Sequence, residues 1–419
     1  MQRICRRVQG VCGATTRIAK RLVATGALTE WSKLLKVQGE MQNKLNEVAL
    51  RKDGISMVMG LREETIASLT SARKEKRADV RELLTLDATL RNWLGAAFSS
   101  ASIEFKRVTW SESTGETLEK VATEDVVLQK VRSIRELKRR LDDGRRCFGL
   151  FHASTRSDPL AFIHVALTRD LAPSLRYLKE NASERQPPTH AIFYSINMAH
   201  PSLSGLDLAL TLIKNVVAEL QAHFPSVHTF STLSPIPGFM SWLGRTARAK
   251  KAAAAAAAAG AVQAPTDCAL SKVLTPDLLA ALSKVSGAPA LADSLTWLHA
   301  ELSSDEWAAS MERQTAVREL VTWLVAHYLC SERSRNLPLD PVARFHLRNG
   351  ASLHRVNWMG NESKSGLAAS AGLMVNYVYD LSQTTTRRDA WPQFHVSSDV
   401  LELLQSQRRA AGPGLTAQG

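Results

Sequence analysis

Two polar side chains far apart in the sequence could perform acid–base chemistry. Ser234 lies in the segment FSTLSPIPGF (230–239), and His346 lies in PVARFHLRNGASLHRVNWM (341–359). A histidine can donate a proton near neutral pH, and a hydroxyl can hold a carboxylate or relay a proton. The alternative interpretation is structural, since a serine before a proline is often a turn residue and a helix histidine is often partly buried and hydrogen bonded.

The loop around Ser234 is predicted to be stiff. Pro235 and Pro237 restrict its backbone, and a residue that precedes a proline is held in an extended conformation. Such a loop would present one hydroxyl in one geometry, which suits a side chain that takes part in a reaction. Ser231 is a neighbouring hydroxyl that could be mistaken for the reactive one.

A third candidate is the turn that precedes a predicted helix. Apolar residues between 206 and 224 recur at steps of three and four after the buried strand HAIFYSI (190–196), which predicts an amphipathic helix. Ser204 and Asp207 fit a capping box, and Gly205 would permit close approach of the backbone. Backbone amides at such a helix N-terminus can bind phosphate. Any capped helix of an α/β fold would show the same pattern, so a purely structural turn is the alternative.

The elements that must position these groups change type after Gly144. From about residue 30 to residue 141 apolar residues recur at helical intervals, which predicts an all-α bundle over 30–144. Short runs rich in strand-forming residues then alternate with helices, which predicts an α/β domain over 145–410. Its first elements are predicted as strands CFGLF (147–151) and LAFIHVAL (160–167), a helix at 175–179, and strands at 190–196 and 227–233.

The segment that contains His346 is predicted to form a short helix. Asp340 can cap it, Pro341 fits its first position, and Asn349 with Gly350 can end it. An Asn-Gly hairpin is the competing interpretation. Strands are predicted to follow at SLHRVNWM (352–359) and at GLMVNYVYDL (372–381), where Tyr377 and Tyr379 would share one face.

The chain loses its regular pattern between the two candidate catalytic segments. Residues 245–266 include eight consecutive alanines, which indicates an Ala-rich, low-complexity linker or a loosely held helical insertion. A helical insertion is predicted at about 267–335, with amphipathic stretches at 278–285, 290–302 and 317–329.

Composition excludes several classes of protein. The chain has 419 residues, of which 45% are hydrophobic and 22% are charged, as in ordinary globular proteins. No apolar run approaches the length of about 18 residues that a membrane span requires. The five cysteines are scattered, and His164 and His354 show no metal-ligand spacing, so neither a disulfide framework nor a metal site is predicted. The net charge of +13 favours an anionic partner, such as a nucleic acid or a phosphorylated small molecule.

The first 29 residues are basic and contain no acidic residue. This composition is typical of a mitochondrial transit peptide, which predicts a location in the mitochondrial matrix. The alternative is an exposed basic first helix of a cytoplasmic protein. The final residues, Ala-Gln-Gly, do not match a peroxisomal signal.

Several motifs together resemble one enzyme family. They are FKRVTW (105–110), HVALT (164–168), AIFYSI (191–196), LSPIPGF (233–239), FHLRNGA (345–351) and GLMVNYVY (372–379). In order and rough spacing they are similar to malonyl-CoA decarboxylases, over about residues 61–379. That resemblance implies a helical N-terminal domain, through which members can form homo-oligomers, and a C-terminal domain like the Gcn5-related N-acetyltransferases.

The resemblance also implies a reaction and a set of site residues. The reaction is conversion of malonyl-CoA to acetyl-CoA and CO2 in fatty acid metabolism, with Ser234 and His346 as catalytic residues. Because the thioester can delocalise the enolate, no metal, biotin or pyridoxal cofactor is expected. The implied substrate-binding residues are Ser204, Gly205, Leu206, Asp207, Leu208, Ala209, Leu210 and Tyr379, together with the catalytic pair.

Two of these residues have alternative roles. The family more often has glutamate at the position of Asp207, and an acid beside a pyrophosphate is unfavourable, so helix capping is the first interpretation and orientation of the catalytic site the second. Tyr379 could equally be a core tyrosine of its strand.

Three other functions compete with decarboxylation. An acyl-CoA-dependent acyltransferase of the same fold is the main alternative, and the Ser234 and His346 pair argues against it. A nucleic-acid-binding protein is suggested only by the net charge, and the sequence lacks the common binding motifs. An inactive scaffold is disfavoured because both proposed catalytic side chains are present.

Overall fold

The computed structural model describes most of the chain between residues 53 and 409. The residues left out of this range are 100, 124–130, 132, 142–143, 156, 183–185 and 259–290, although 283, 286 and 287 within the last gap are described. Residues 43 and 45–47 are also described. The predicted transit peptide (1–29) and the stretch 278–285, except for residue 283, lie outside the described residues. The chain divides into two compact units, one ending at His164 but including Ile196–Leu220, the other made of Val165–Ser195 and everything from Gln221.

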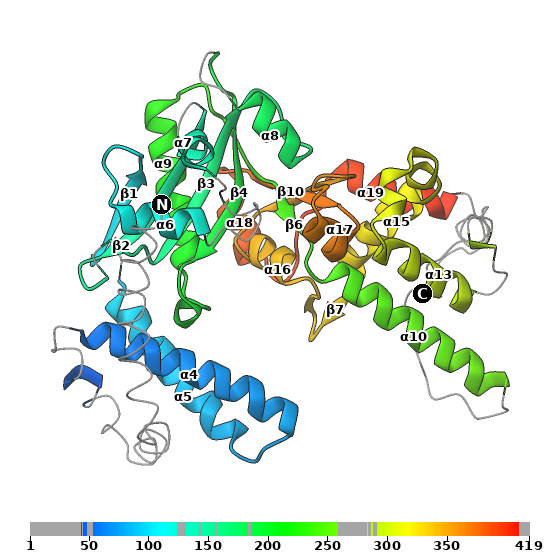
Figure 1. Cartoon of the computed structure of the whole chain (residues 1–419), viewed down its shortest axis with the longest axis horizontal. Helices are drawn as coiled ribbons and strands as arrows, with labels where there is room; N and C mark the ends of the chain where they lie inside the picture. Colours follow the sequence, from blue (N-terminus) through cyan, green and yellow to red (C-terminus); the bar gives the residue numbers. More distant parts are fainter. Residues whose placement is uncertain are drawn as a thin grey trace. The chain divides into compact units, whose positions relative to one another are not determined.

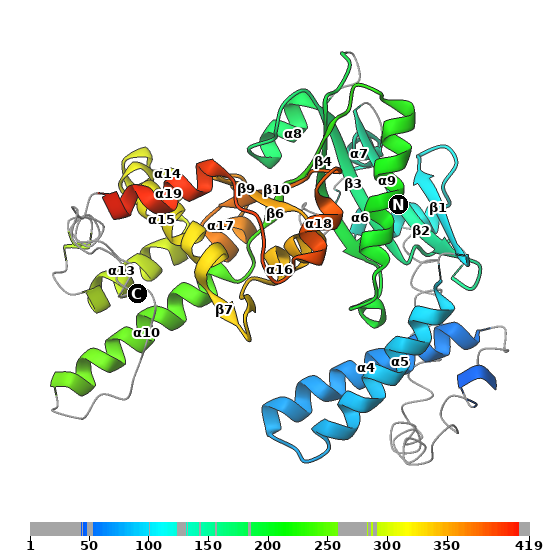
Figure 2. The same cartoon turned by 180° about the vertical axis from the view of Figure 1, so that it is seen from behind.

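Unit 1 begins with two long helices, α4 (Gly54–Glu75) and α5 (Val80–Ala97). They lie side by side in Figures 1 and 2, where they are blue. The turn between them starts at Lys76, which ends α4 in the left-handed conformation with φ of 53°. The two helices share a small core that contains Leu69, Ala72 and Leu83. The predicted helical N-terminal region is confirmed over the described residues 54–97.

Within residues 30–144, which were predicted as an all-α bundle, the described part of the chain also contains a strand. Strand β1 (Ile103–Val108) lies inside the segment predicted as helical, and it pairs antiparallel with β2 (Arg145–His152), with Val108 opposite Cys147. Most β1 side chains are exposed or partly exposed, so this edge strand lacks the apolar run that marks a buried strand. Helices α6 (Gly115–Thr123) and α7 (Ile134–Leu141) share a core with β2, formed by Val108, Val121, Leu137, Leu141, Cys147, Phe151 and Phe162. A domain boundary at residue 144 would therefore separate β1 from β2, although these two strands pair with each other.

A 3-10 turn, η1 (Pro201–Leu203), precedes helix α9 (Leu208–His223). The helix begins three residues later than the predicted capping box requires, because Gly205 has φ of +78° and keeps the preceding turn out of the helix. The carbonyl of Asp207 accepts the first helical hydrogen bond, from Thr211, so Asp207 rather than Ser204 occupies the N-cap position.

The strands form one sheet in the order β1-β2-β3-β4-β5-β10-β6, with β9 paired to β10. The remaining strands are β3 (Ala161–Thr168), β4 (His190–Met198), β5 (Thr229–Thr232), β6 (Ser234–Pro235), β9 (Ser352–Asn357) and β10 (Met374–Tyr379). Strands β4 and β5 are parallel, as a strand-helix-strand crossover requires. Strand β10 runs antiparallel to β5, β6 and β9, so it joins three segments that are distant in sequence.

Unit 2 contains most of the remaining helices. These are α8 (Leu175–Asn181), α10 (Phe239–Ala258), α13 (Leu291–Ser303), α14 (Glu306–Ala309), α15 (Met311–Ser331), α16 (Pro341–Arg348), α17 (Lys364–Ser370), α18 (Thr384–Asp389) and α19 (Ser398–Arg409), with a small pair of strands, β7 (Arg333–Ser334) and β8 (Leu337–Pro338). Helices α10 and α13 lie side by side (Figures 1 and 2). Because α10 continues to Ala258, the described part of the predicted linker is helical, which fits the alternative of a helical insertion.

The mixed helix and strand architecture confirms the predicted α+β class, with a helical N-terminal region. The likeness to acetyltransferases stays an expectation from the sequence.

Candidate active site

Ser234 lies on the two-residue strand β6, where Val375 of β10 is its partner. The side chain is 5% exposed, and its hydroxyl donates to Thr232 Oγ1 at 2.9 Å. Ser231, the neighbouring hydroxyl, donates instead to the carbonyls of Thr232 and Tyr377 within the sheet. The structure therefore gives Ser231 a structural role and leaves Ser234 facing a different group.

That group is His346 on helix α16. The helix forms as predicted: Asp340 accepts from the N–H groups of Val342 and Ala343, and Gly350 follows its end with φ of +85°. A Cβ at position 350 would collide with the carbonyl oxygen of Thr384, so only glycine fits there. The imidazole is 4% exposed, and its Nε2 lies 3.1 Å from Ser234 Oγ. Two side chains that are 112 residues apart in sequence thus meet directly.

Two tyrosines of β10 complete the surroundings of His346. The Tyr379 hydroxyl lies 2.9 Å from His346 Nδ1, and the Tyr377 ring stacks on the imidazole with centroids 4.8 Å apart. Both tyrosines face the same group, as expected of positions two apart on a strand. Tyr379 was predicted as a site residue, whereas the contact of Tyr377 with the histidine was not.

The polar groups form a continuous chain: Tyr379, His346, Ser234 and Thr232. Because Ser234 donates its only proton to Thr232, its oxygen is left to accept from His346 Nε2, and Nδ1 can then accept from Tyr379. Thr232 also accepts from the N–H of Tyr377 at 3.1 Å. Sequence reasoning missed Thr232, which ends β5 two residues before Ser234 begins β6.

Burial sets the charge of these groups. It lowers the pKa of His346 to about 3, so the imidazole is neutral at neutral pH in the ligand-free protein. Burial also raises the pKa of Tyr379, which therefore keeps its proton. A neutral imidazole between two hydroxyls can exchange a proton with either neighbour, and an anion that entered the site would favour the charged form of the ring.

The turn at 204–210 belongs to unit 1. Ser204, Gly205 and Asp207 are exposed. Arg62 of α4 holds the segment just before this turn, because its guanidinium donates to the carbonyls of Ser202 (2.5 Å) and Ser204 (2.8 Å).

Arg62 is itself 3% exposed and pairs with Asp87 of α5 at 2.9 Å. Sequence reasoning missed this arginine, because nothing in the helical pattern of α4 separates a buried arginine from an exposed one.

Comparison with known proteins now decides the family. Residues 102–411 match the family described as "Malonyl-CoA decarboxylase C-terminal domain", which covers most of the chain. The chain belongs to the malonyl-CoA decarboxylase family. A relative from Anser anser anser, "Malonyl-CoA decarboxylase, mitochondrial", is 34% identical over 345 residues, and one of the same name from Rattus norvegicus is 35% identical over 336 residues. These alignments cover 81% and 79% of this chain, but the chain spans only 63% of each relative.

Solved structures of family members agree with this assignment. The malonyl-CoA decarboxylase from Cupriavidus metallidurans is 31% identical, with a TM-score of 0.62 over 84% of this chain and 78% of that one. The protein of the same name from Rhodopseudomonas palustris is 26% identical, with a TM-score of 0.67 over 94% of this chain and 81% of that one. The chain therefore shares the fold of the malonyl-CoA decarboxylases.

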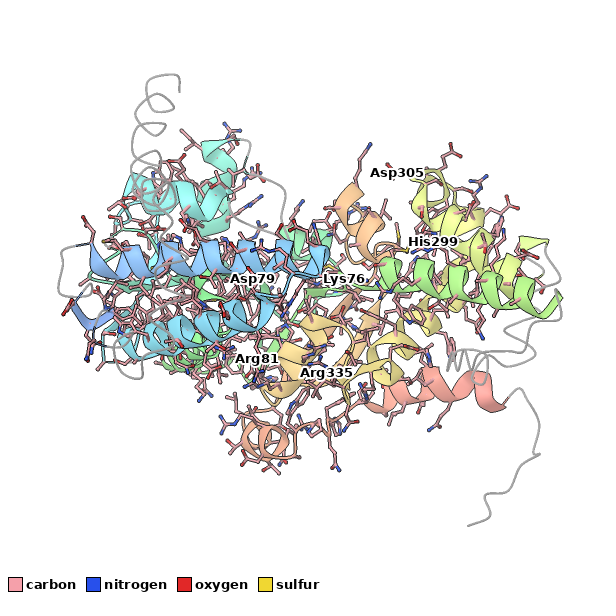
Figure 3. The ribbon with its side chains drawn as sticks, turned by 90° about the horizontal axis from the view of Figure 1, so that it is seen from below. Lys76, Asp79, Arg81, His299, Asp305 and Arg335 are labelled. Atoms are coloured by element: carbon pink, nitrogen blue, oxygen red, sulfur yellow. The ribbon has the colours of Figure 1, made fainter. Side chains whose placement is uncertain are left out.

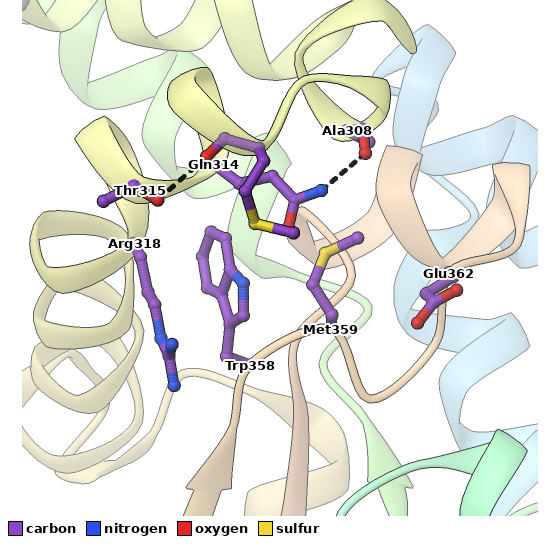
Figure 4. A pocket seen from close by; sticks show the side chains of 8 residues that line it. Ala308, Gln314, Thr315, Arg318, Trp358, Met359 and Glu362 are labelled. Atoms are coloured by element: carbon purple, nitrogen blue, oxygen red, sulfur yellow. Dashed lines mark hydrogen bonds between the residues drawn. The ribbon is translucent and has the colours of Figure 1, made fainter.

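A pocket of about 360 Å³ elsewhere in unit 2 contains none of the residues that the family resemblance implies. It is lined by Ala308, Met311, Gln314, Thr315, Arg318, Trp358, Met359 and Glu362 (Figure 4). Two hydrogen bonds at its rim, from Gln314 to Ala308 O and from Thr315 to Met311 O, stay within the α14–α15 segment.

Neither a metal centre nor a membrane span is found among the described residues. No group of three or more His, Cys, Asp and Glu side chains could hold a metal ion there. No helix in the same part of the chain is long and apolar enough to cross a bilayer.

Proposed function

We propose that this chain decarboxylates malonyl-CoA to acetyl-CoA and CO2, as the names of its relatives suggest. One observation carries the proposal: Ser234 Oγ lies 3.1 Å from His346 Nε2, and the other imidazole nitrogen lies 2.9 Å from the Tyr379 hydroxyl, in a buried site. This is a hydrogen-bonded acid–base group removed from water, which is what the protonation of a carbanion requires.

In the proposed mechanism the protein holds the carboxylate and supplies a proton. When the bond between the carboxylate carbon and the malonyl α-carbon breaks, its electron pair passes to the thioester as an enolate. Ser234 turns its hydroxyl hydrogen from Thr232 to the departing carboxylate, and His346 gives a proton to the α-carbon. The ligand-free imidazole is neutral, but a carboxylate beside it raises its pKa, so the substrate itself favours the protonated form that the reaction uses. Solvent then returns one proton for each turnover.

Coenzyme binding is assigned to residues 204–210. Gly205 is exposed and α9 begins three residues later, so the helix N-terminus beside this turn can offer backbone amides to a pyrophosphate. Asp207 stands at the N-cap position, which supports a capping role for it rather than contact with phosphate.

The location and assembly of the protein are also part of the proposal. A mitochondrial location is supported by the basic residues 1–29 and by relatives whose names include "mitochondrial". Association of copies through the helical N-terminal region is proposed from the family resemblance.

Incubation of the purified chain with malonyl-CoA, without added metal or cofactor, tests the proposed reaction. We expect acetyl-CoA and CO2 to appear in equal amounts. Malonyl-CoA that stays intact in the presence of folded protein would refute decarboxylation, and malonyl transfer to an added amine without CO2 release would favour the acyltransferase alternative.

A further inference from the structure

One buried carboxylate connects the segments that carry Ser234 and His346. Asp340 is 0% exposed and stands directly before α16. Its Oδ1 accepts from the N–H of Val342 at 3.0 Å and from the N–H of Ala343 at 2.9 Å. These bonds fix the first turn of the helix that presents His346.

The same carboxylate also contacts the loop that contains Ser234. The N–H of Gly238, four residues after Ser234, donates to Asp340, and the Tyr328 hydroxyl of α15 donates to Asp340 Oδ2 at 3.4 Å. Gly238 approaches so closely that a Cβ there would overlap the Tyr328 hydroxyl and stand 3.5 Å from Asp340 Oδ2. One side chain thus fixes both the start of α16 and the end of the Pro235–Pro237 loop.

We infer that Asp340 is a positioning residue that holds Ser234 and His346 at hydrogen-bonding distance. The hydrogen bonds of Asp340 go to other groups than these two side chains, so it acts through the backbone at Gly238 and through the first turn of α16. The inference rests on the proposed function, in which this distance matters for proton transfer. A displacement of either segment would lengthen the 3.1 Å contact, and a misplacement of about 1 Å can cost about 100-fold in rate.

The competing interpretation is that Asp340 is only a helix cap. Asparagine separates the two roles, because it is an equally good N-cap residue. In Asp340→Asn the side-chain oxygen can still accept from Val342 and Ala343, and the amide nitrogen can donate to the Tyr328 oxygen. That nitrogen replaces Oδ2, the oxygen that lies beside Gly238, and it cannot accept from the Gly238 N–H, so this variant keeps the cap and breaks the connection to the Ser234 loop.

The first test compares two cap variants. We expect Asp340→Asn to lower kcat by about 10- to 100-fold with KM for malonyl-CoA within about threefold of wild type. Ser174→Ala, which removes the cap bond to Tyr177 N on α8, is the matched control and should keep kcat while lowering the thermal midpoint. If Asp340→Asn does not fold, Asp340→Ser offers a shorter capping oxygen for the same comparison. A kcat within about threefold of wild type in either folded variant would overturn the inference.

The second test asks whether Asp340 acts through the catalytic pair. In a Ser234→Ala background, Asp340→Asn should lower kcat by less than about threefold, because the distance that it maintains no longer matters. A loss as large as in the wild-type background would show a general structural effect and overturn the inference.

A third measurement does not depend on turnover. The imidazole ¹⁵N signals of His346, assigned by their absence in His346→Asn, should move in Asp340→Asn but not in Ser174→Ala. Unchanged signals would overturn the inference. If the signals move but the protein releases no CO2, the inference about Asp340 is supported and only the proposed function is refuted.

Discussion

The two groups of proposed site residues differ in their contact with water. His346, Tyr379 and Ser234 are buried, each no more than 5% exposed, whereas the turn at Ser204, Gly205 and Asp207 is exposed. Burial shifts the pKa of the histidine and strengthens each hydrogen bond around it. An exposed turn suits phosphates instead, because they can keep much of their hydration while backbone amides bind them.

The stiffness of the two regions has different sources. In the buried region, side chains hold one another, from Thr232 to Tyr379. In the exposed region the buried Arg62 side chain donates to the carbonyls of Ser202 and Ser204, at the start of the turn. Substitutions in the first region should therefore affect the chemical step, and substitutions in the second should affect substrate binding.

The largest effect is expected at His346. If its imidazole supplies the proton, His346→Asn should lower kcat by about 100- to 10,000-fold, the range of a positioned general acid, with little change in the thermal midpoint. Ser234→Ala should lower kcat in the same way, and the double variant should be much less than multiplicatively worse. Steady-state kinetics at saturating malonyl-CoA measure this. Turnover of His346→Asn within about threefold of wild type would remove His346 from the mechanism.

Acid should destabilise the buried region through the same histidine. Burial lowers the pKa of His346 to about 3, whereas an unfolded histidine titrates near about 6.5. Between these two pH values the unfolded chain binds a proton that the folded chain does not. The stability that the neutral His346 contributes is therefore fully present above about pH 6.5, and it falls by about 1.4 kcal/mol per pH unit toward pH 3.

Urea unfolding at two pH values checks this sign and size. Between pH 7.5 and 5.0 the wild type should lose about 2 kcal/mol more stability than His346→Asn, since the other histidines are common to both proteins. Equal losses in the two proteins would contradict a neutral buried imidazole.

A smaller effect is expected in the exposed region. In Arg62→Lys the ammonium cannot donate to both carbonyls and to Asp87 in the same geometry, so the turn should loosen. KM for malonyl-CoA should rise by about 3- to 10-fold with kcat nearly constant. The matched control is Arg77→Lys, which changes an ion pair with Asp79 in the exposed turn between α4 and α5 and should leave KM unchanged. Lys76 and Asp79, which flank that turn, are labelled in Figure 3. A fall in kcat without a rise in KM would contradict the division between the two regions.

Local sequence patterns predicted local structure well. The helix from Pro341 to Arg348 has the cap, proline and terminal glycine that the sequence indicated, and most predicted strands of the α/β region are present. The patterns failed where long-range contacts decide the outcome. Strand β1 forms because β2 pairs with it, and α9 begins at Leu208 because the backbone at Gly205 turns away.

The candidate site followed from resemblance more than from residue patterns. Nothing in the spacing of Ser234 and His346 shows that they meet, because sheet pairing through β10 brings the two segments together. The stacking of Tyr377 and the carboxylate contacts of Asp340 depend equally on tertiary structure, so they could be found only in the folded chain.

The central place of β10 has a consequence for biosynthesis. This strand pairs with β5, β6 and β9, but the ribosome makes it after all three. Until it emerges, the nascent chain carries Ser234 and His346 without the strand that joins their segments, and β5 presents an open edge that can pair with other chains. Enzyme activity should therefore appear late in synthesis, and ribosome stalling before residue 374 should yield inactive, aggregation-prone fragments.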